Sequence, residues 1–167
     1  MKKEVRLYNV LFPVWLLWLF PQIFLIVAPA NLLVDCLVLT LALMALKHQN
    51  KRSVVKELWW KFWWRGFAAD FIGVLVLLPG LFLPVIFPNV PGIEGMDTAM
   101  IANPFLHPVA FLWVLAGVAV AGVCIYRFDK RAMKECELLT QREKHVVALT
   151  MAIVTAPWLF FIPLYWY

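Results

Sequence analysis

Two carboxylates stand out in this sequence because they lie inside long apolar runs. Asp35 occurs within NLLVDCLVLTLALMAL, and Asp70 occurs within GFAADFIGVLVLL. A charged group at the centre of a membrane helix costs roughly 2.5 to 3.5 kcal/mol on insertion scales, so such groups are rare and face protein or water. They commonly mark ion paths and proton relays. We therefore take Asp70 and Asp35 as candidate ion or proton sites.

A purely structural role is the alternative for each carboxylate. Asp35 falls in the first turn of a predicted helix, where the helix dipole favours an anion. Asp70 follows Arg65 by five residues, about 140° around a helix, so the two are poorly placed to pair within one helix. Measured from the cytoplasmic ends of their predicted helices, the depths of Asp35 and Asp70 differ by roughly 10 Å. We therefore expect two separate carboxylates and not one paired site.

Other residue types offer little chemistry. His107 has no second ligand at metal-binding spacing, and the three cysteines (Cys36, Cys124 and Cys136) form no C-x-x-C pair. The sequence contains no nucleophile elbow, phosphate loop or H-E-x-x-H motif. We predict a protein without a catalytic site, metal or cofactor, and not an enzyme.

The distribution of positive charge predicts how the chain is organised. All fifteen Lys and Arg residues fall within residues 2–6, 47–65 and 127–144, while 64% of the chain is hydrophobic and only 15% is charged. Soluble domains are nearer half apolar with about 25% charged residues. Cationic loops beside membrane spans stay in the cytoplasm. This pattern predicts an integral membrane protein, with anionic lipid headgroups and not nucleic acid as its partner.

The apolar runs predict an all-α membrane bundle of five transmembrane helices. We expect them at about 7–27, 31–46, 66–87, 105–126 and 145–164, as one domain with the N-terminus inside and the C-terminus outside. The first two would be joined by a turn at residues 28–31, with Asn31 as an N-cap. Asn103 and Pro104 suit the start of the fourth helix. Thr140 and Glu143 have capping-box spacing, which predicts a helix start just after Thr140.

Residues 53–65 (SVVKELWWKFWWR) contain four tryptophans, a residue type that prefers the headgroup layer. The segment is either a separate cytoplasmic interfacial helix or the first turns of a long third helix. In both cases its tryptophans would anchor it at the interface: Trp59, Trp60, Trp63 and Trp64.

Gly117 and Ala121 are four residues apart and form a small-x-x-x-small face, which is typical of close helix packing in membranes. The partner helix belongs either to this chain or to another one, so a membrane-protein partner or a homo-oligomer is open.

Several sequence blocks suggest a family. LYNVLFPVWLLWLFP, APANLLVDCLVL, GFAADFIG, NPFLHPVAFLWV and TAPWLF resemble those of a group of small, uncharacterised multi-pass membrane proteins of Gram-positive bacteria. The resemblance implies a bacterial cytoplasmic membrane and carries no activity.

Three functions follow from these observations. The first is an accessory or transport-related membrane component that works through helix contacts. The alternative is a small proton or cation channel or carrier that uses Asp35 and Asp70. The second alternative is a membrane-embedded lipid-modifying enzyme. A flux assay in vesicles distinguishes the first two.

Overall fold

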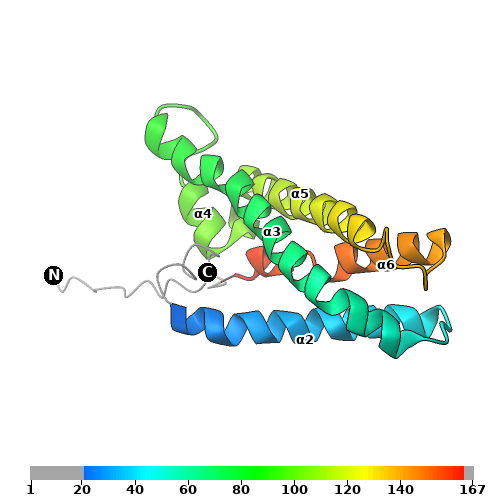
Figure 1. Cartoon of the computed structure of the whole chain (residues 1–167). Coiled ribbons are helices and arrows are strands. Elements are labelled where there is room, and N and C mark those ends of the chain that lie inside the picture. The colour runs from blue at the N-terminus through cyan, green and yellow to red at the C-terminus, as the bar shows by residue number, and fades with distance from the viewer. Residues whose placement is uncertain (1–20, 164–167) are drawn as a thin grey trace.

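The computed structural model describes residues 21–163, except the side chains of residues 21–24 and 26. Within this range the chain is helical and has no strand (Figure 1). The elements are α2 (Pro21–Ala45), α3 (Lys51–Ile86), α4 (Met96–Ala102), the 3₁₀ helix η1 (Pro104–Leu106), α5 (Pro108–Ala132), α6 (Gln141–Val154) and the 3₁₀ helix η2 (Trp158–Phe161).

Four segments are long and apolar enough to cross a membrane: Val27–Ala45, Lys51–Ile86, Pro108–Ala132 and Gln141–Phe161. Their outward faces are apolar as well. On α2, Leu33, Leu37 and Leu41 lie four residues apart and are 70%, 58% and 53% exposed. Soluble proteins rarely expose large contiguous apolar patches. A helical bundle with leucine outside and aspartate inside is what a membrane protein requires.

Helix α2 is continuous through Pro29, so the predicted turn at residues 28–31 is wrong. Proline removes one helical hydrogen bond, and membrane helices tolerate this loss when neighbouring groups compensate. The carbonyl that Pro29 leaves free is that of Leu25. Trp63 Nε1 of α3 donates to the neighbouring carbonyl Ala28 O at 2.9 Å and so fastens α2 to α3 beside this proline. Residues 21–27 of the predicted first span therefore belong to α2, and residues 7–20 lie outside the described residues.

Helix α3 is also continuous, which decides between the two alternatives for residues 53–65. They form the first turns of the long helix and not a separate one. The 36 residues of α3 extend about 54 Å at 1.5 Å per residue, well beyond a hydrocarbon core of roughly 30 Å. Trp59, Trp60 and Trp64 are exposed near its start. The first turns of α3 can therefore reach the headgroup layer without leaving the helix.

The predicted loop at residues 88–104 contains the short helix α4, and two caps follow it. Asn103 Oδ1 accepts from Phe105 N at 3.1 Å and begins η1 with Pro104 in its first turn. His107 Nδ1 then accepts from Ala110 N at 3.2 Å and caps α5. The capping role of Asn103 is thus confirmed, but α5 begins at Pro108 instead of 105.

At the cationic end of the bundle, the end of α5 differs from the prediction, whereas the start of α6 confirms it. Helix α5 continues to Ala132, past the predicted end at 126, so Asp129 is helical. The capping box of Thr140 and Glu143 is present, and α6 begins at Gln141 as predicted. However, α6 ends at Val154, so only the first part of the predicted span 145–164 is α-helical.

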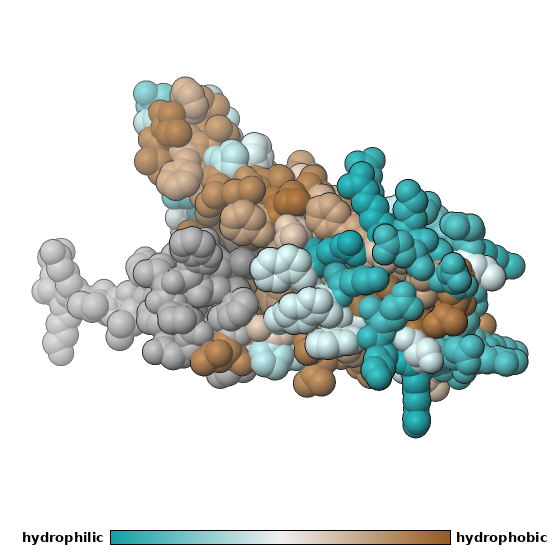
Figure 2. Space-filling model, viewed as in Figure 1, coloured by the Kyte–Doolittle hydropathy of each residue, from teal (hydrophilic) through white to brown (hydrophobic). Residues whose placement is uncertain are grey.

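Hydrophilic residues gather at one end of the molecule (Figure 2), where the α2–α3 and α5–α6 connections lie (Figure 1). Beneath them is a buried cluster that includes Leu43, Leu58, Met133 and Val147. A second buried cluster under α4 includes Met96, Met100 and Val114. The cationic segments at residues 47–65 and 127–144 therefore share one end, as a common membrane side requires.

Candidate functional site

The small residues of α5 pack against α3 of the same chain. A Cβ atom added at Gly73 would lie 3.1 Å from Ala121 Cβ and 3.3 Å from Gly117 O. A Cβ atom added at Gly117 would lie 2.7 Å from Leu77 Cδ2. The two antiparallel backbones thus approach as closely as small residues permit. This answers the question that the sequence left open, because the face of Gly117 and Ala121 has its partner within the chain.

The same register brings a cation and a carboxylate together. Asp129 follows Ala121 by two steps of four residues, and Arg65 precedes Gly73 by two such steps. Arg65 and Asp129 therefore lie opposite each other, near enough for their charges to interact. Asp129 is only 2% exposed.

Helix α2 adds a third element to this site. Asp35 is 4% exposed, and its Oδ2 lies 3.6 Å from the position that a Cβ of Gly66 would occupy. The charge of Asp35 interacts with those of both Asp70 and Asp129. We call Asp35, Asp70, Asp129 and Arg65 the carboxylate cluster.

The charges of Asp35 and Asp70 interact, although no hydrogen bond joins the two residues in the described part of the chain, so their separateness stays a prediction. The depth predicted for Asp70 is wrong, because it placed the cytoplasmic start of the third helix near residue 66, whereas α3 begins at Lys51. Asp70 consequently lies several turns further into its helix than predicted. The oblique crossing of α3 over α2 (Figure 1) brings Gly66 and the adjoining turn against Asp35.

The cluster is short of hydrogen bonds and of positive charge. Asp35 Oδ2, Asp70 Oδ1 and Arg65 Nη1 are buried and have no hydrogen-bond partner among the described residues. Buried polar atoms are rarely left unpaired in native structures unless a function, a water or an ion explains them. The charge of Arg65 acts on Asp129, whereas Asp35 acts on both Asp70 and Asp129, so full ionisation of the three carboxylates would leave excess negative charge in a low-dielectric site. Protons or a bound cation have to balance it.

The carboxylates of the cluster do not meet at one point as the ligands of a single metal ion would. Within residues 21–163, no three His, Cys, Asp or Glu side chains converge as a metal site would require. The carboxylates therefore act on one another through space and do not form a common ligand shell. A proton needs only one oxygen at a time, so this spacing suits proton binding.

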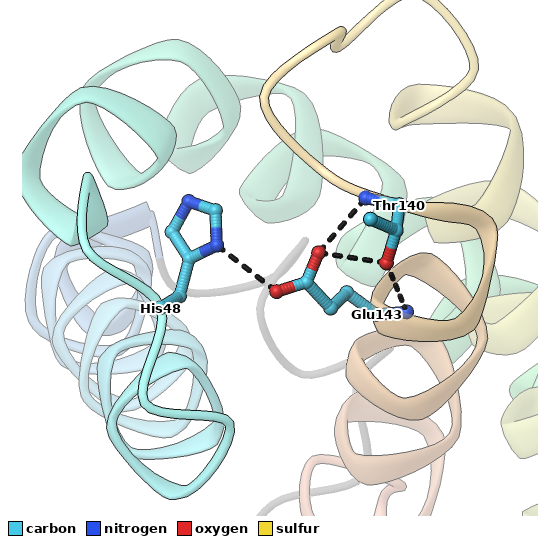
Figure 3. Close-up of polar contacts among 3 residues, drawn as sticks. All are labelled: His48, Thr140 and Glu143. Atoms are coloured by element: carbon cyan, nitrogen blue, oxygen red, sulfur yellow. Dashed lines mark hydrogen bonds and ion pairs between the residues drawn. The ribbon is translucent and has the colours of Figure 1, made fainter.

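A second polar contact joins the α2–α3 connection to the start of α6 at the cationic end of the bundle (Figure 3). His48 Nδ1, in the α2–α3 connection, lies 3.0 Å from Glu143 Oε1 in the first turn of α6. The other carboxylate oxygen of Glu143 accepts from Thr140 N and Thr140 Oγ1, both at 2.8 Å. Glu143 thus caps α6 and fastens the two cationic connections to each other.

Sequence reasoning missed Asp129, which it placed in a cytoplasmic segment. A signal was available, because Gly117, Ala121, Ile125 and Asp129 recur every four residues and so lie along one face of α5. Extending the small-residue face by two turns would have found the carboxylate. His107, which has no second metal ligand at binding distance in the sequence, is a helix cap in the structure.

No protein-family model, curated protein or solved structure matches this chain. The resemblance to small membrane proteins of Gram-positive bacteria stays a prediction. The helical fold and the carboxylate cluster are accordingly the basis for a function.

Proposed function

We propose that this protein is a small multi-pass membrane protein that transfers protons through the carboxylate cluster. The observation that carries the proposal is a group of interacting carboxylates inside the bundle: Asp35 and Asp129 are buried, Asp70 is half-buried, and oxygens of Asp35 and Asp70 are unpaired among the described residues. Carboxylates inside a membrane bundle are costly and serve proton relays in pumps and transporters. A monovalent cation is the alternative cargo.

The proposal includes a membrane orientation. The α2–α3 and α5–α6 connections carry the cationic segments, so they face the cytoplasm, and the α3–α4 connection faces the opposite side. The cytoplasmic position of the N-terminus rests on residues 1–20, which lie outside the described residues. A bacterial cytoplasmic membrane as the location is likewise part of the proposal.

Proton flux into vesicles tests the proposal directly. The purified protein is reconstituted with a pH-sensitive dye inside, and valinomycin with a potassium gradient sets the membrane potential. We expect wild-type vesicles to acidify faster than empty ones. Asp70→Asn and Asp129→Asn should each slow the flux by roughly tenfold or more, because an amide cannot exchange a proton at neutral pH.

The matched control is Glu94→Gln, which changes an exposed carboxylate in the α3–α4 connection. It should leave the flux unchanged. Repeating the assay with a sodium gradient and no potential separates sodium from proton transfer. If wild-type vesicles carry neither ion faster than empty ones, the transfer proposal fails and an accessory component becomes the better hypothesis. The absence of enzymatic activity stays a prediction.

A further inference from the structure

An open apolar groove runs between α5 and α6 on the outside of the bundle. It has a volume of about 460 Å³. Its floor is made of small or buried residues, and Gly122 brings the helices so close that an added Cβ would lie 3.4 Å from Ala152 O. Its lining is almost wholly apolar: Leu115, Val118, Ala119, Val123, Leu149 and Ile153 among others. Ligand pockets commonly have roughly 300 to 1,000 Å³ and a few placed polar groups.

The polar groups of this groove gather at its cationic end. Tyr126 and His145 both line the groove, and Tyr126 Oη lies 2.8 Å from His145 Nδ1. Lys130 Nζ donates to Tyr126 Oη at 3.2 Å, one turn further along α5. The Lys130 ammonium has three N–H donors, and two of them remain free to donate to a ligand. The groove is thus apolar along its length and cationic at one end.

Glu143, the acidic residue in the first turn of α6, does not cancel the charge at this end. Glu143 is directed to Thr140 and His48 and is engaged by them. Arg127 and Arg131 are exposed in the last turns of α5 beside Lys130. An anionic group here would gain several cationic neighbours and would also lie near the positive end of α6.

The length of the groove indicates which molecule fits it. From Leu115 to Tyr126 it follows α5 for about 16 Å at 1.5 Å per residue. Half of a hydrocarbon core of roughly 30 Å is about 15 Å, the depth of one leaflet. A helix of a second chain would cross both leaflets, whereas a single acyl chain occupies one. The length, the apolar lining and the cationic end together match one phospholipid.

We propose that this groove is a binding site for an anionic phospholipid, with an acyl chain along α5 and α6 and the phosphate at Lys130 and Tyr126. The site is independent of the carboxylate cluster and of proton transfer. It adds a specific ligand site to the general attraction that anionic headgroups have for cationic loops.

Native mass spectrometry from a neutral detergent tests the site with two probes that share their acyl chains. Palmitoyl-oleoyl phosphatidylglycerol should form a one-to-one complex at a concentration roughly tenfold lower than palmitoyl-oleoyl phosphatidylcholine. Lys130→Gln should remove this preference and retain the weaker binding of both lipids. Ala119→Phe, which places a ring in the groove from an exposed position, should weaken the binding of both lipids.

Arg52→Gln is the charge-matched control, because Arg52 is an exposed cation outside the groove lining. It should leave the preference intact. Equal binding of the two lipids to the wild-type protein would overturn the proposal. So would phosphatidylglycerol binding that survives both Lys130→Gln and Ala119→Phe, or a dimer that forms in place of the lipid complex. Both variants change exposed residues, and their melting temperatures in detergent check that they are folded.

Discussion

The contact between Gly80 of α3 and Trp113 of α5 offers a sharp test of the helix packing. A Cβ atom added at Gly80 would lie 2.7 Å from both Cδ1 and Nε1 of Trp113, and 3.0 Å from Met100 Sδ. Trp113 Nε1 donates to Val76 O at 2.8 Å. In Gly80→Ala the indole has to move, and its hydrogen bond to α3 is strained or lost.

The expected loss of stability combines three effects. Overpacking a filled site costs typically about 1 to 3 kcal/mol, and a lost hydrogen bond costs about 0.5 to 1.5 kcal/mol. Alanine regains about 1 kcal/mol over glycine inside a helix. The net destabilisation is therefore roughly 0.5 to 3.5 kcal/mol, and each kcal/mol lowers the melting temperature by about 2 to 4 °C for a chain of this size.

Gly122→Ala is the matched control because the same change meets a different environment. The nearest atom to its added Cβ is Ala152 O at 3.4 Å, which is close to ordinary contact. We expect stability from unchanged to about 1 kcal/mol higher, since the helix-propensity gain remains. Trp113→Phe combined with Gly80→Ala should recover part of the loss, because residues in contact couple energetically.

The measurement is unfolding in detergent, by heat or by titration with dodecyl sulfate, followed by circular dichroism. Equal stability of Gly80→Ala and Gly122→Ala would refute the packing described between α3 and α5. A lower stability of Gly122→Ala than of Gly80→Ala would refute it as well.

The other predictions concern the orientation and the cationic end of the bundle. Cysteines at Asn50 and Glu135 should react with an impermeant reagent from one side of the membrane and a cysteine at Glu94 from the other, and labelling of all three from one side would contradict the orientation. Thr140→Ala should lower stability by about 1 kcal/mol through loss of the capping box, whereas Thr140→Ser should change stability little. Unfolding followed by circular dichroism measures the stability of the two variants. Equal losses of stability in the two variants would show that the hydroxyl cap is unimportant. Burial raises the pKa of the Cys136 thiol and so lowers the fraction present as thiolate. Maleimide should therefore modify Cys136 slowly at neutral pH and faster after unfolding. Rapid modification of the folded protein would show that this thiol is accessible.

Local signals in the sequence predicted the features that depend on neighbouring residues. Long apolar runs gave the helical bundle, because lipid requires each spanning segment to satisfy its own backbone. Thr140 and Glu143 correctly located the start of α6, because a capping box involves only residues three apart. The spacing of Gly117 and Ala121 identified a packing face, although not its partner.

Features that depend on tertiary contacts were not predicted. Pro29 suggested a turn, but α2 continues through it and packs against α3, where Trp63 donates to Ala28 O. The carboxylate cluster requires three helices to cross at one level, and the depth of Asp70 depends on where α3 begins. The residues beside Asp70 indicate neither the crossing of the three helices nor the residue at which α3 begins.

The unequal lengths of the helices have a consequence for the surrounding bilayer. Helix α6 has only 14 residues, about 21 Å at 1.5 Å per residue, against roughly 30 Å of hydrocarbon. The chain continues beyond it as the turn and 3₁₀ helix of residues 155–161. Lipids beside α6 therefore contact a shorter helix than lipids beside α3. Such hydrophobic mismatch is relieved by local thinning of the bilayer at a cost of a fraction of a kcal/mol per Å. The stability of this protein should thus depend on membrane thickness, and thin bilayers should suit it best.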